Sequence, residues 1–158
     1  MRRKERAVTE PAKIREIIRK SQVLRVGYCD RGEVYIVPVN FGCAEENGAY
    51  TFYFHGASGG RKYALSKQGC PVGFELEAVA EVVVDDTRPW SPTCRFQSVI
   101  GTGRISLITD LEEKRRLLRL ILSHYTDAHL CQFDEASIRQ TAVFQLRAEQ
   151  MTCKERTL

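Results

Sequence analysis

The chain has 158 residues, 43% of them hydrophobic and 28% charged, which suits one compact domain with its own core. The formal net charge is only +4 and acidic residues are spread among the basic ones, so the sequence does not favour a nucleic-acid-binding protein. No apolar run is long enough to span a bilayer, and no N-terminal stretch is typical of a signal peptide. We therefore expect a single cytoplasmic domain over residues 1–158 that contacts neither membranes nor nucleic acid.

The six cysteines predict neither a metal site nor a disulfide framework, because no C-x-x-C pair and no histidine at ligand spacing accompanies them. They are Cys29, Cys43, Cys70, Cys94, Cys131 and Cys153. We expect free thiols that pack as small hydrophobic residues. A catalytic role for Cys70 or Cys94 stays open, but no Cys/His motif supports it.

The first elements expected are a flexible arm over residues 1–8 and a helix. Residues 1–6 form a basic run, typical of a solvated terminus. A capping residue, an acid and a proline follow at residues 9–11, and isoleucines at helical spacing then form one apolar stripe. This helix should end near Ser21.

A β-hairpin is expected between residues 23 and 41, where two apolar runs flank a glycine-containing turn at residues 30–32. Pro38 in the second strand cannot donate to a sheet ladder, so this strand should lie at an edge, at a bulge or beside a ligand. Residues 45–48 form the next turn, and the aromatic residues that follow alternate up to His55.

Residues 52–62 are the most informative segment, because a strand, a turn of small residues and a basic helix start follow one another. The small residues let a ligand approach backbone amides, and a helix N-terminus carries unpaired N–H groups and a positive dipole end. Arg61 and Lys62 add positive charge there. The segment favours an anion such as phosphate. No Walker or Rossmann glycine pattern accompanies it, and an exposed helix lysine is the alternative for Lys62.

The remaining β patterns lie beyond a short helix expected at residues 58–68. Residues 72–84 predict a long strand or a bent pair, and residues 96–108 predict another strand, which contains two glycines. The proline-bounded loop between them contains Trp90. Two roles are open for Trp90, covering a ligand or packing against the body of the protein.

Two further helices and a last strand complete the chain. Thr109 and Glu112 match a capping box at the start of an amphipathic helix. A short helix at residues 134–139 and a strand at residues 141–146 should follow. Roughly six strands with few helices argue for an antiparallel barrel or sheet rather than a doubly wound parallel fold.

Several segments match a known family in their order and spacing. They are Met1-Arg2-Arg3-Lys4, Val37-Pro38-Val39-Asn40-Phe41, Phe54-His55-Gly56-Ala57 with Gly60-Arg61-Lys62, Ser98-Val99-Ile100-Gly101-Thr102-Gly103-Arg104, and Glu112-Glu113-Lys114-Arg115. On these segments the chain resembles the FMN-binding split-barrel proteins, within the group related to nitroimidazole-resistance proteins and to pyridoxamine 5′-phosphate oxidase. The resemblance covers nearly the whole chain.

The resemblance implies a mainly β fold with peripheral helices, a six-stranded antiparallel split β-barrel. It also implies a homodimer with FMN in a cleft at the subunit interface, and Lys62 as the main partner of the FMN phosphate. The cofactor-binding residues that it implies are Val37, Pro38, Val39, Asn40, His55, Gly56, Ala57, Arg61, Lys62, Ser98 and Val99.

Bland alternatives stay open for several of these residues. Pro38 is equally typical of an edge strand, and Asn40 of a turn. The glycines after Ser98 permit close approach by a ligand or a partner, or else mark a bulge. A strand histidine such as His55 is often structural, so no catalytic residue is identified.

The function implied by the resemblance is an FMN-dependent oxidoreductase that reduces a small acceptor such as a nitroaromatic compound. The sequence has no catalytic triad, carboxylate pair or metal cluster, which fits a protein whose cofactor does the chemistry, and equally fits a binding module. A pyridoxamine 5′-phosphate oxidase-like enzyme is the second possibility, but no second basic cluster is present to hold a substrate phosphate. The third is a flavin-binding protein without turnover, a carrier or sensor.

Overall fold

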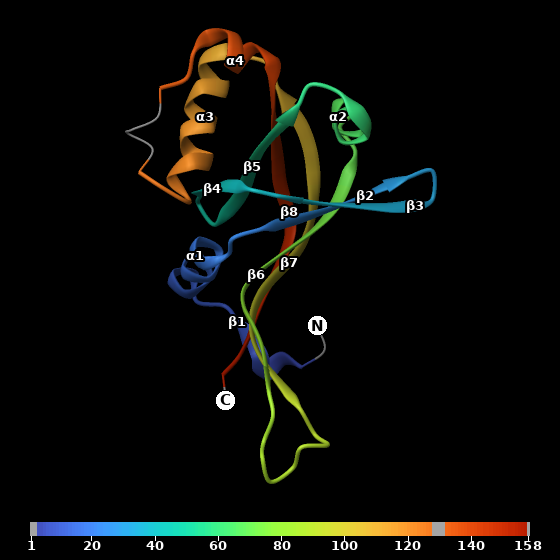
Figure 1. The fold of residues 1–158 in the computed structure, drawn as a ribbon, viewed down its shortest axis with the longest axis vertical. Coiled ribbons are helices and arrows are strands. Elements are labelled where there is room, and N and C mark those ends of the chain that lie inside the picture. The colour runs from blue at the N-terminus through green and yellow to red at the C-terminus, as the bar shows by residue number, and fades with distance from the viewer. Residues whose placement is uncertain (1–2, 128–131, 158) are drawn as a thin grey trace.

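The computed structural model describes residues 3–127 and 132–157, and over these residues it contains one antiparallel sheet surrounded by helices (Figure 1). The strands are β1 (Ala7–Val8), β2 (Leu24–Asp30), β3 (Glu33–Val39), β4 (Phe41–Glu46), β5 (Ala49–Ala57), β6 (Pro71–Val83), β7 (Thr93–Ile108) and β8 (Thr141–Arg156). The helices are a 3-10 turn (Lys4–Arg6), α1 (Pro11–Lys20), α2 (Gly60–Lys67), α3 (Leu111–Ser123) and α4 (Glu135–Gln140). The sheet order is β3-β2-β6-β7-β8-β5-β4, with β1 paired to β8.

The two edge strands of this order, β3 and β4, are consecutive in the chain and are joined by Asn40 alone. One residue spans at most about 3.6 Å, so the two edges must approach each other at this point. The sheet therefore curls round, but within the described residues β3 and β4 do not pair, and the barrel is not closed. This is the mainly β, split-barrel fold expected from the sequence, with β1 and β4 in addition to the six strands expected.

The edge position predicted for the strand with Pro38 is confirmed, since β3 pairs only with β2 in the described sheet. The predicted turn is also confirmed. Arg31 and Gly32 both have positive φ, 54° and 88°, as a two-residue hairpin turn requires.

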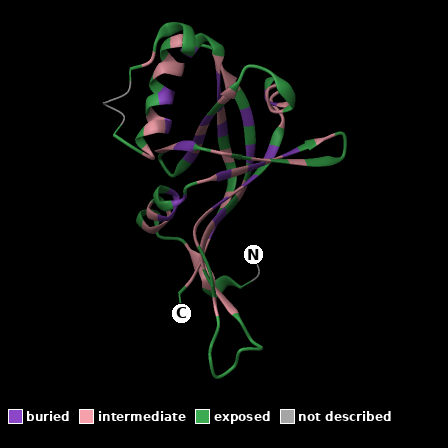
Figure 2. Ribbon diagram, viewed as in Figure 1, coloured by how far each residue is buried: buried purple, intermediate pink, exposed green. Residues whose placement is uncertain are grey.

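Alternation along the strands places one face of the sheet inside the barrel. Aromatic side chains dominate this interior, where Phe41, Phe52, Phe54, Phe74 and Phe144 are buried. Each such side chain contributes about 1.5–3 kcal/mol through burial. Figure 2 shows the buried residues along the middle of the long strands and on one stripe of α3.

A second, smaller core lies between α3, α4 and the outer face of β8. It is formed by buried aliphatic residues, namely Leu117, Leu118, Ile121, Ile138 and Val143. On the other side, Ile17 and Ile18 of α1 are buried in the barrel core. The apolar stripes predicted for both helices are thus the faces that cover the sheet.

The two glycines of β7 allow the backbone of β8 to approach closely. A Cβ at Gly103 would lie 2.2 Å from the carbonyl oxygen of Arg147, and one at Gly101 would lie 2.4 Å from that of Gln150. Both carbonyls belong to β8, and the register between β7 and β8 shifts between Thr102 and Gly103. The bulge interpretation is therefore confirmed, since it is β8 that approaches these glycines closely.

The expectation of a flexible arm is wrong for residues 4–8. These residues form the 3-10 turn and β1, in which Ala7 pairs with Lys154 and Val8 with Cys153. The backbone of β1 gains hydrogen bonds from β8, which a sequence pattern of two residues cannot reveal. Met1 and Arg2 lie outside the described residues.

Two further boundaries differ from the sequence predictions. Asp110 rather than Thr109 caps α3, because its carboxylate accepts a hydrogen bond from the backbone N–H of Glu113 at 2.8 Å. The last strand continues well beyond Leu146 to Arg156. Its second half is rich in polar residues, so it lacks the apolar alternation that marks a strand in sequence.

The described cysteines, Cys29, Cys43, Cys70, Cys94 and Cys153, are free thiols. Cys131 and His129 lie outside the described residues. Within the described ranges no three His, Cys, Asp or Glu side chains cluster as metal ligands would, and no helix there has the length and apolar character needed to cross a membrane.

The close contact at Gly103 generates a prediction. Gly103→Ala should lower the free energy of unfolding by about 1–3 kcal/mol, because the new methyl group forces β7 away from the backbone of β8. Gly27→Ala is the matched control, since a Cβ there lies 3.7 Å from the nearest atom, an ordinary contact. Urea unfolding of both variants measures the difference. Equal stabilities would contradict the role given to Gly103.

Candidate functional site

The turn from β5 into α2 is the part of the fold that the sequence marks for an anion. Gly59 precedes the helix with an extended backbone, and Gly60 has a φ of 82°, which favours glycine. No side chain caps the N–H groups of the first turn. A Cβ on either glycine would meet no atom within 4 Å, so the space beside this helix start is open.

Lys62, in the first turn of α2, folds back over the end of the barrel core. Its Nζ donates a hydrogen bond to the carbonyl oxygen of His55 at 3.4 Å. It also lies over two stacked aromatic rings, 5.6 Å from the centroid of Phe54 and 4.9 Å from that of Phe144. Gly56 makes room for it, because a Cβ there would be 2.6 Å from Nζ.

The charge of Lys62 is not balanced by a carboxylate in the described part of the chain. Burial lowers the pKa of its ammonium, because the charged form loses water there. A carbonyl and two ring faces compensate this cation only in part. The arrangement therefore favours an anion at this position.

Arg61, the neighbouring cation, is held differently. Its guanidinium donates to Asp30 at 2.7 Å and to Glu33 at 3.3 Å, and it lies 4.7 Å from the ring centroid of Tyr35. The hydrogen bond to Asp30 raises its pKa. These contacts connect α2 to the β2–β3 hairpin and neutralise Arg61, so Lys62 is the cation of this turn that lacks a counter-ion.

The imidazole of His55 lies on the other face of β5 from Phe54. It lines a small pocket of about 160 Å³ with apolar residues of α3 and α4, among them Leu118 and Ile138. Burial and then the charge of Lys62 lower the pKa of His55 below its usual 6.5, so the ring is neutral at pH 7. The imidazole of His55 thus faces α3 and α4, while its carbonyl oxygen contacts Lys62. Sequence patterns do not reveal that the two groups of this residue have different surroundings.

The segment at residues 37–40 runs beside the same turn. Phe41 pairs with Phe54, so the register brings Asn40 next to His55 where β3 leaves the barrel. At the other end of β3, Glu33 contacts Arg61. Val37 and Val39 pack against the core, while Pro38 and Asn40 are exposed. The register thus places Asn40 beside His55 where β3 and β5 separate without pairing in the described sheet, and the carbonyl of His55 contacts Lys62 there. We call this unpaired gap in the sheet the opening.

Ser98 and Val99 lie apart from this opening. Their strand, β7, is separated from β3 by β2 and β6, about 14 Å across the sheet. The side chain of Val99 is fully buried in the core, whereas Ser98 lies on the outer face opposite Glu77. One chain alone does not bring Ser98 to Lys62.

Trp90 is also remote from this opening. It lies in the loop between β6 and β7, at the far end of these strands from α2, and is 78% exposed (Figure 1). It does not pack against the barrel. His124 caps the C-terminus of α3 and its Nε2 lies 2.7 Å from the carbonyl oxygen of Ser21, so it contacts a backbone carbonyl of the segment after α1.

Comparison with known proteins identifies the family of this chain. A family profile described as pyridoxamine 5′-phosphate oxidase matches residues 10–155. A search of curated proteins found no match.

Among solved structures, a candidate 5-nitroimidazole antibiotic resistance protein from Bacteroides thetaiotaomicron is 29% identical, with a TM-score of 0.76 over 94% of this chain and 85% of that one. A flavocytochrome from Azotobacter vinelandii is 24% identical, with a TM-score of 0.81 over 100% and 72% of the two chains. An FAD- and haem-binding protein from Mycobacterium smegmatis is 18% identical, with a TM-score of 0.79 over 97% and 74%. The last two similarities establish the shared fold.

The electrostatic link between Lys62 and His55 generates a prediction. Lys62→Met should raise the pKa of His55 toward 6.5, because the nearby positive charge is removed while the burial remains. Lys67→Met, at the exposed end of the same helix, should leave it unchanged. An NMR titration of the imidazole resonances measures both, and an unshifted pKa in Lys62→Met would show that the two side chains do not interact.

Proposed function

Because the chain belongs to the pyridoxamine 5′-phosphate oxidase family, whose profile matches residues 10–155, we propose that it is a flavoprotein that binds FMN and reduces a small acceptor such as a nitroaromatic compound. The observation that carries this proposal is the charge of Lys62. It is a partly buried cation without a carboxylate partner in the described residues, beside an uncapped helix start with open space around Gly59 and Gly60. A phosphate supplies the missing negative charge.

The residues around the opening fit the parts of FMN in order. Lys62 and the first N–H groups of α2 hold the phosphate, and Gly56 and Ala57 allow the chain that bears it to pass close to the backbone of β5. The edge of β3 from Val37 to Asn40 lines the flavin ring through main-chain groups, and Pro38 removes one donor there. His55 contributes its carbonyl, which orients the ammonium of Lys62.

Bound flavin supplies the electron-transfer chemistry, so the chain needs no side-chain nucleophile. The side chains and backbone of the protein position the flavin ring at the opening of the apolar barrel and hold the phosphate. The neutral imidazole of His55 adds no positive charge beside the phosphate site at pH 7, which leaves Lys62 to select the anion.

Reduction of a small acceptor is favoured over oxidation of a pyridoxine phosphate. The similarity to the Bacteroides protein, at 29% identity, points toward nitroimidazole-type compounds. A phosphorylated substrate needs a second cationic site, but Arg61 is neutralised by Asp30 and Glu33. A flavin carrier or sensor would have the same cofactor site and differ only in turnover.

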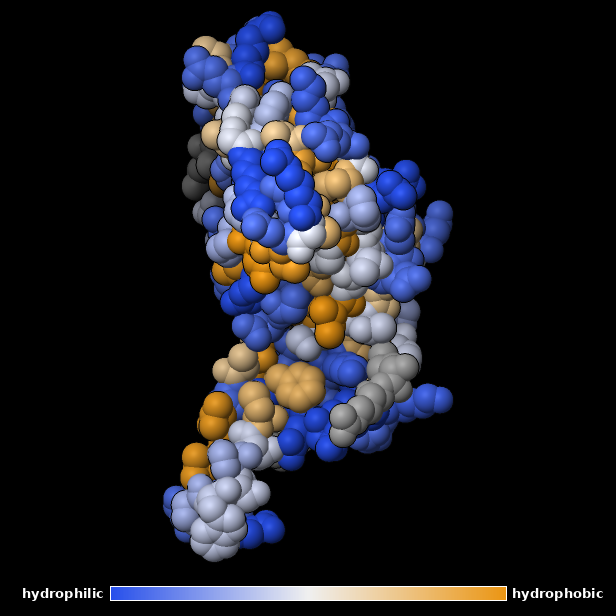
Figure 3. All heavy atoms as spheres, turned by 90° about the vertical axis from the view of Figure 1, so that its right-hand side faces the viewer, coloured by the Kyte–Doolittle hydropathy of each residue, from blue (hydrophilic) through white to orange (hydrophobic). Residues whose placement is uncertain are grey.

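A second copy of the chain completes the site in this proposal. The outer face of β3, β2, β6 and β7 exposes apolar side chains, with Val34 75% and Ile36 60% exposed. The register aligns Ile36 with Gly27 and Gly73, and Figure 3 shows small apolar groups among polar residues on the side of the molecule that carries this hairpin. Ser98 lies on the same face, so a twofold pair brings the second copy's β7 toward the flavin. A flavin-loaded monomer in sedimentation would contradict this.

The role of Lys62 is tested by flavin affinity. Lys62→Met should weaken FMN binding by about 1–3 kcal/mol, or roughly 5- to 150-fold in Kd, because a charge-assisted contact to phosphate is lost. Lys67→Met is the matched control on the same helix and should bind normally. Quenching of flavin fluorescence during titration of the apoprotein gives both values. Equal affinities of wild type and Lys62→Met would refute the phosphate role.

Turnover is tested by the colour of the protein. The purified protein should be yellow. Under anaerobic conditions, reduced nicotinamide should bleach the flavin absorbance, and a nitroimidazole added afterwards should restore it. A yellow protein inert to donors and acceptors would instead favour the carrier or sensor. A colourless protein that cannot be reconstituted with FMN would refute all flavin-based functions.

A further inference from the structure

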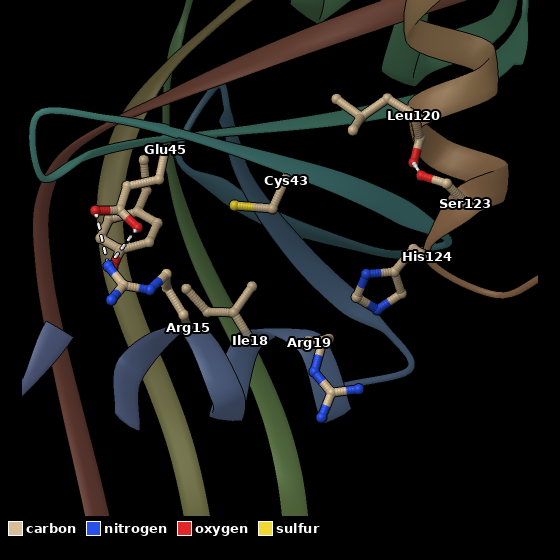
Figure 4. A pocket seen from close by; sticks show the side chains of 9 residues that line it. Arg15, Ile18, Arg19, Cys43, Glu45, Leu120, Ser123 and His124 are labelled. Atoms are coloured by element: carbon tan, nitrogen blue, oxygen red, sulfur yellow. Dashed lines mark hydrogen bonds and ion pairs between the residues drawn. The ribbon is translucent and has the colours of Figure 1, made fainter. Parts of the chain in front are cut away.

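A second pocket lies between α1, the β4–β5 hairpin and the C-terminal end of α3, and contains none of the residues proposed for the cofactor (Figure 4). Its volume is about 450 Å³, within the range of small-molecule sites. Tyr50 lines it, five residues before His55 on β5. The pocket and the flavin site are therefore about 17 Å apart along one strand.

The walls of this pocket are fixed by packing and hydrogen bonds. β4 lies so close to α3 that a Cβ on Gly42 would be 2.8 Å from the carbonyl oxygen of Leu120. The end of α3 is tied to the segment after α1, since His124 contacts the carbonyl of Ser21 and Tyr125 donates to that of Gln22 at 2.9 Å. The shape is thus preorganised for a ligand.

The pocket carries one uncompensated positive charge. Arg15 on one side is neutralised by Glu45 at 3.1 Å. Arg19 lies on the other side, next to His124 in Figure 4, and has no hydrogen bond or ion pair within residues 3–127 and 132–157. A guanidinium in this position is suited to a carboxylate, which it binds with two parallel hydrogen bonds.

Two further polar groups of the wall are acceptors. Ser21 offers a carbonyl oxygen to the ring of His124, so Nε2 carries the hydrogen, and this tautomer leaves Nδ1 as an acceptor. The hydroxyl of Ser123 donates to the carbonyl of Leu120 at 2.8 Å and keeps its lone pairs. A ligand hydroxyl or amine matches these groups.

The middle of the pocket is apolar. Ile18 and Leu120 line it, and Cys43 lies between them (Figure 4). Burial raises the pKa of the Cys43 thiol to about 12, so it is uncharged and behaves as a small apolar group. This surface accommodates the body of an aromatic or branched aliphatic molecule.

We propose that this pocket binds a small organic acid, with its carboxylate on Arg19, its apolar body against Cys43, Ile18 and Leu120, and a hydroxyl directed to His124 or Ser123. The site is separate from the flavin opening, so the proposal stands whether or not the protein binds FMN.

The probe for the test is 4-hydroxybenzoate, added to the full-length protein and followed by NMR chemical-shift perturbation and calorimetry. Saturable shifts should appear for Cys43, Tyr50 and Ser123. Arg19→Gln should weaken binding about fivefold or more, because one charge-assisted contact is lost. Arg119→Gln removes the same charge from an exposed residue of α3 that does not line the pocket, and should bind as wild type.

Neutral 4-hydroxybenzamide separates recognition of the charge from simple filling of the pocket. The amide should bind wild type more weakly than the acid does. Arg19→Gln should bind the amide and the acid with equal affinity. The proposal is overturned if wild type shows no saturable shifts, if the shifts lie outside the pocket, or if Arg19→Gln binds the acid as tightly as Arg119→Gln.

Discussion

Asn40 alone joins β3 and β4, the two edge strands of the sheet, and this short link forces their ends to meet. β3 pairs with β2 at one end of the strand order, whereas β4 pairs with β5 at the other. The sheet must therefore curl round the aromatic core. Beyond Asn40, β3 diverges from the end of β5, and the barrel stays open there. This geometry accounts for the opening and for the unpaired edge of β3.

The same geometry explains why two adjacent cations have different roles. Arg61 reaches the hairpin end of β3, where Asp30 and Glu33 neutralise it, and so contacts the edge strand from α2. Lys62, one residue later, turns inward over Phe54 and Phe144. Partial burial makes its unbalanced charge costly, so this position favours an anion. The ion pairs of Arg61 are exposed and contribute little by themselves.

Local features of the fold could be predicted from sequence, whereas features formed between distant segments could not. Pro11 and the turn at Gly32 depend only on neighbouring residues, and both were predictable. β4 was missed because Asn40 alone separates it from β3, and one residue gives no recognisable turn sequence. The polar half of β8 was missed because its order comes from pairing with β7 and β1.

The site was predictable to the same extent. Lys62 could be proposed from sequence as an anion ligand, because small residues and a helix start surround it there. Phe144, whose ring lies beneath its ammonium, comes from a strand some eighty residues later, and no local pattern links the two. The neutralisation of Arg61 depends on a hairpin thirty residues earlier. The pocket at Arg19 combines residues of four elements and gives no motif at all.

The central claim is that the charge of Lys62 recognises the phosphate of the flavin. A thermodynamic cycle tests it most directly, with FMN and riboflavin each bound to the wild-type protein and to Lys62→Met. The account predicts that loss of the phosphate weakens binding to wild type by about 1–3 kcal/mol more than binding to the variant, because the variant keeps only the N–H contacts of α2. Equal losses in both proteins would show that the phosphate binds elsewhere and would contradict the account.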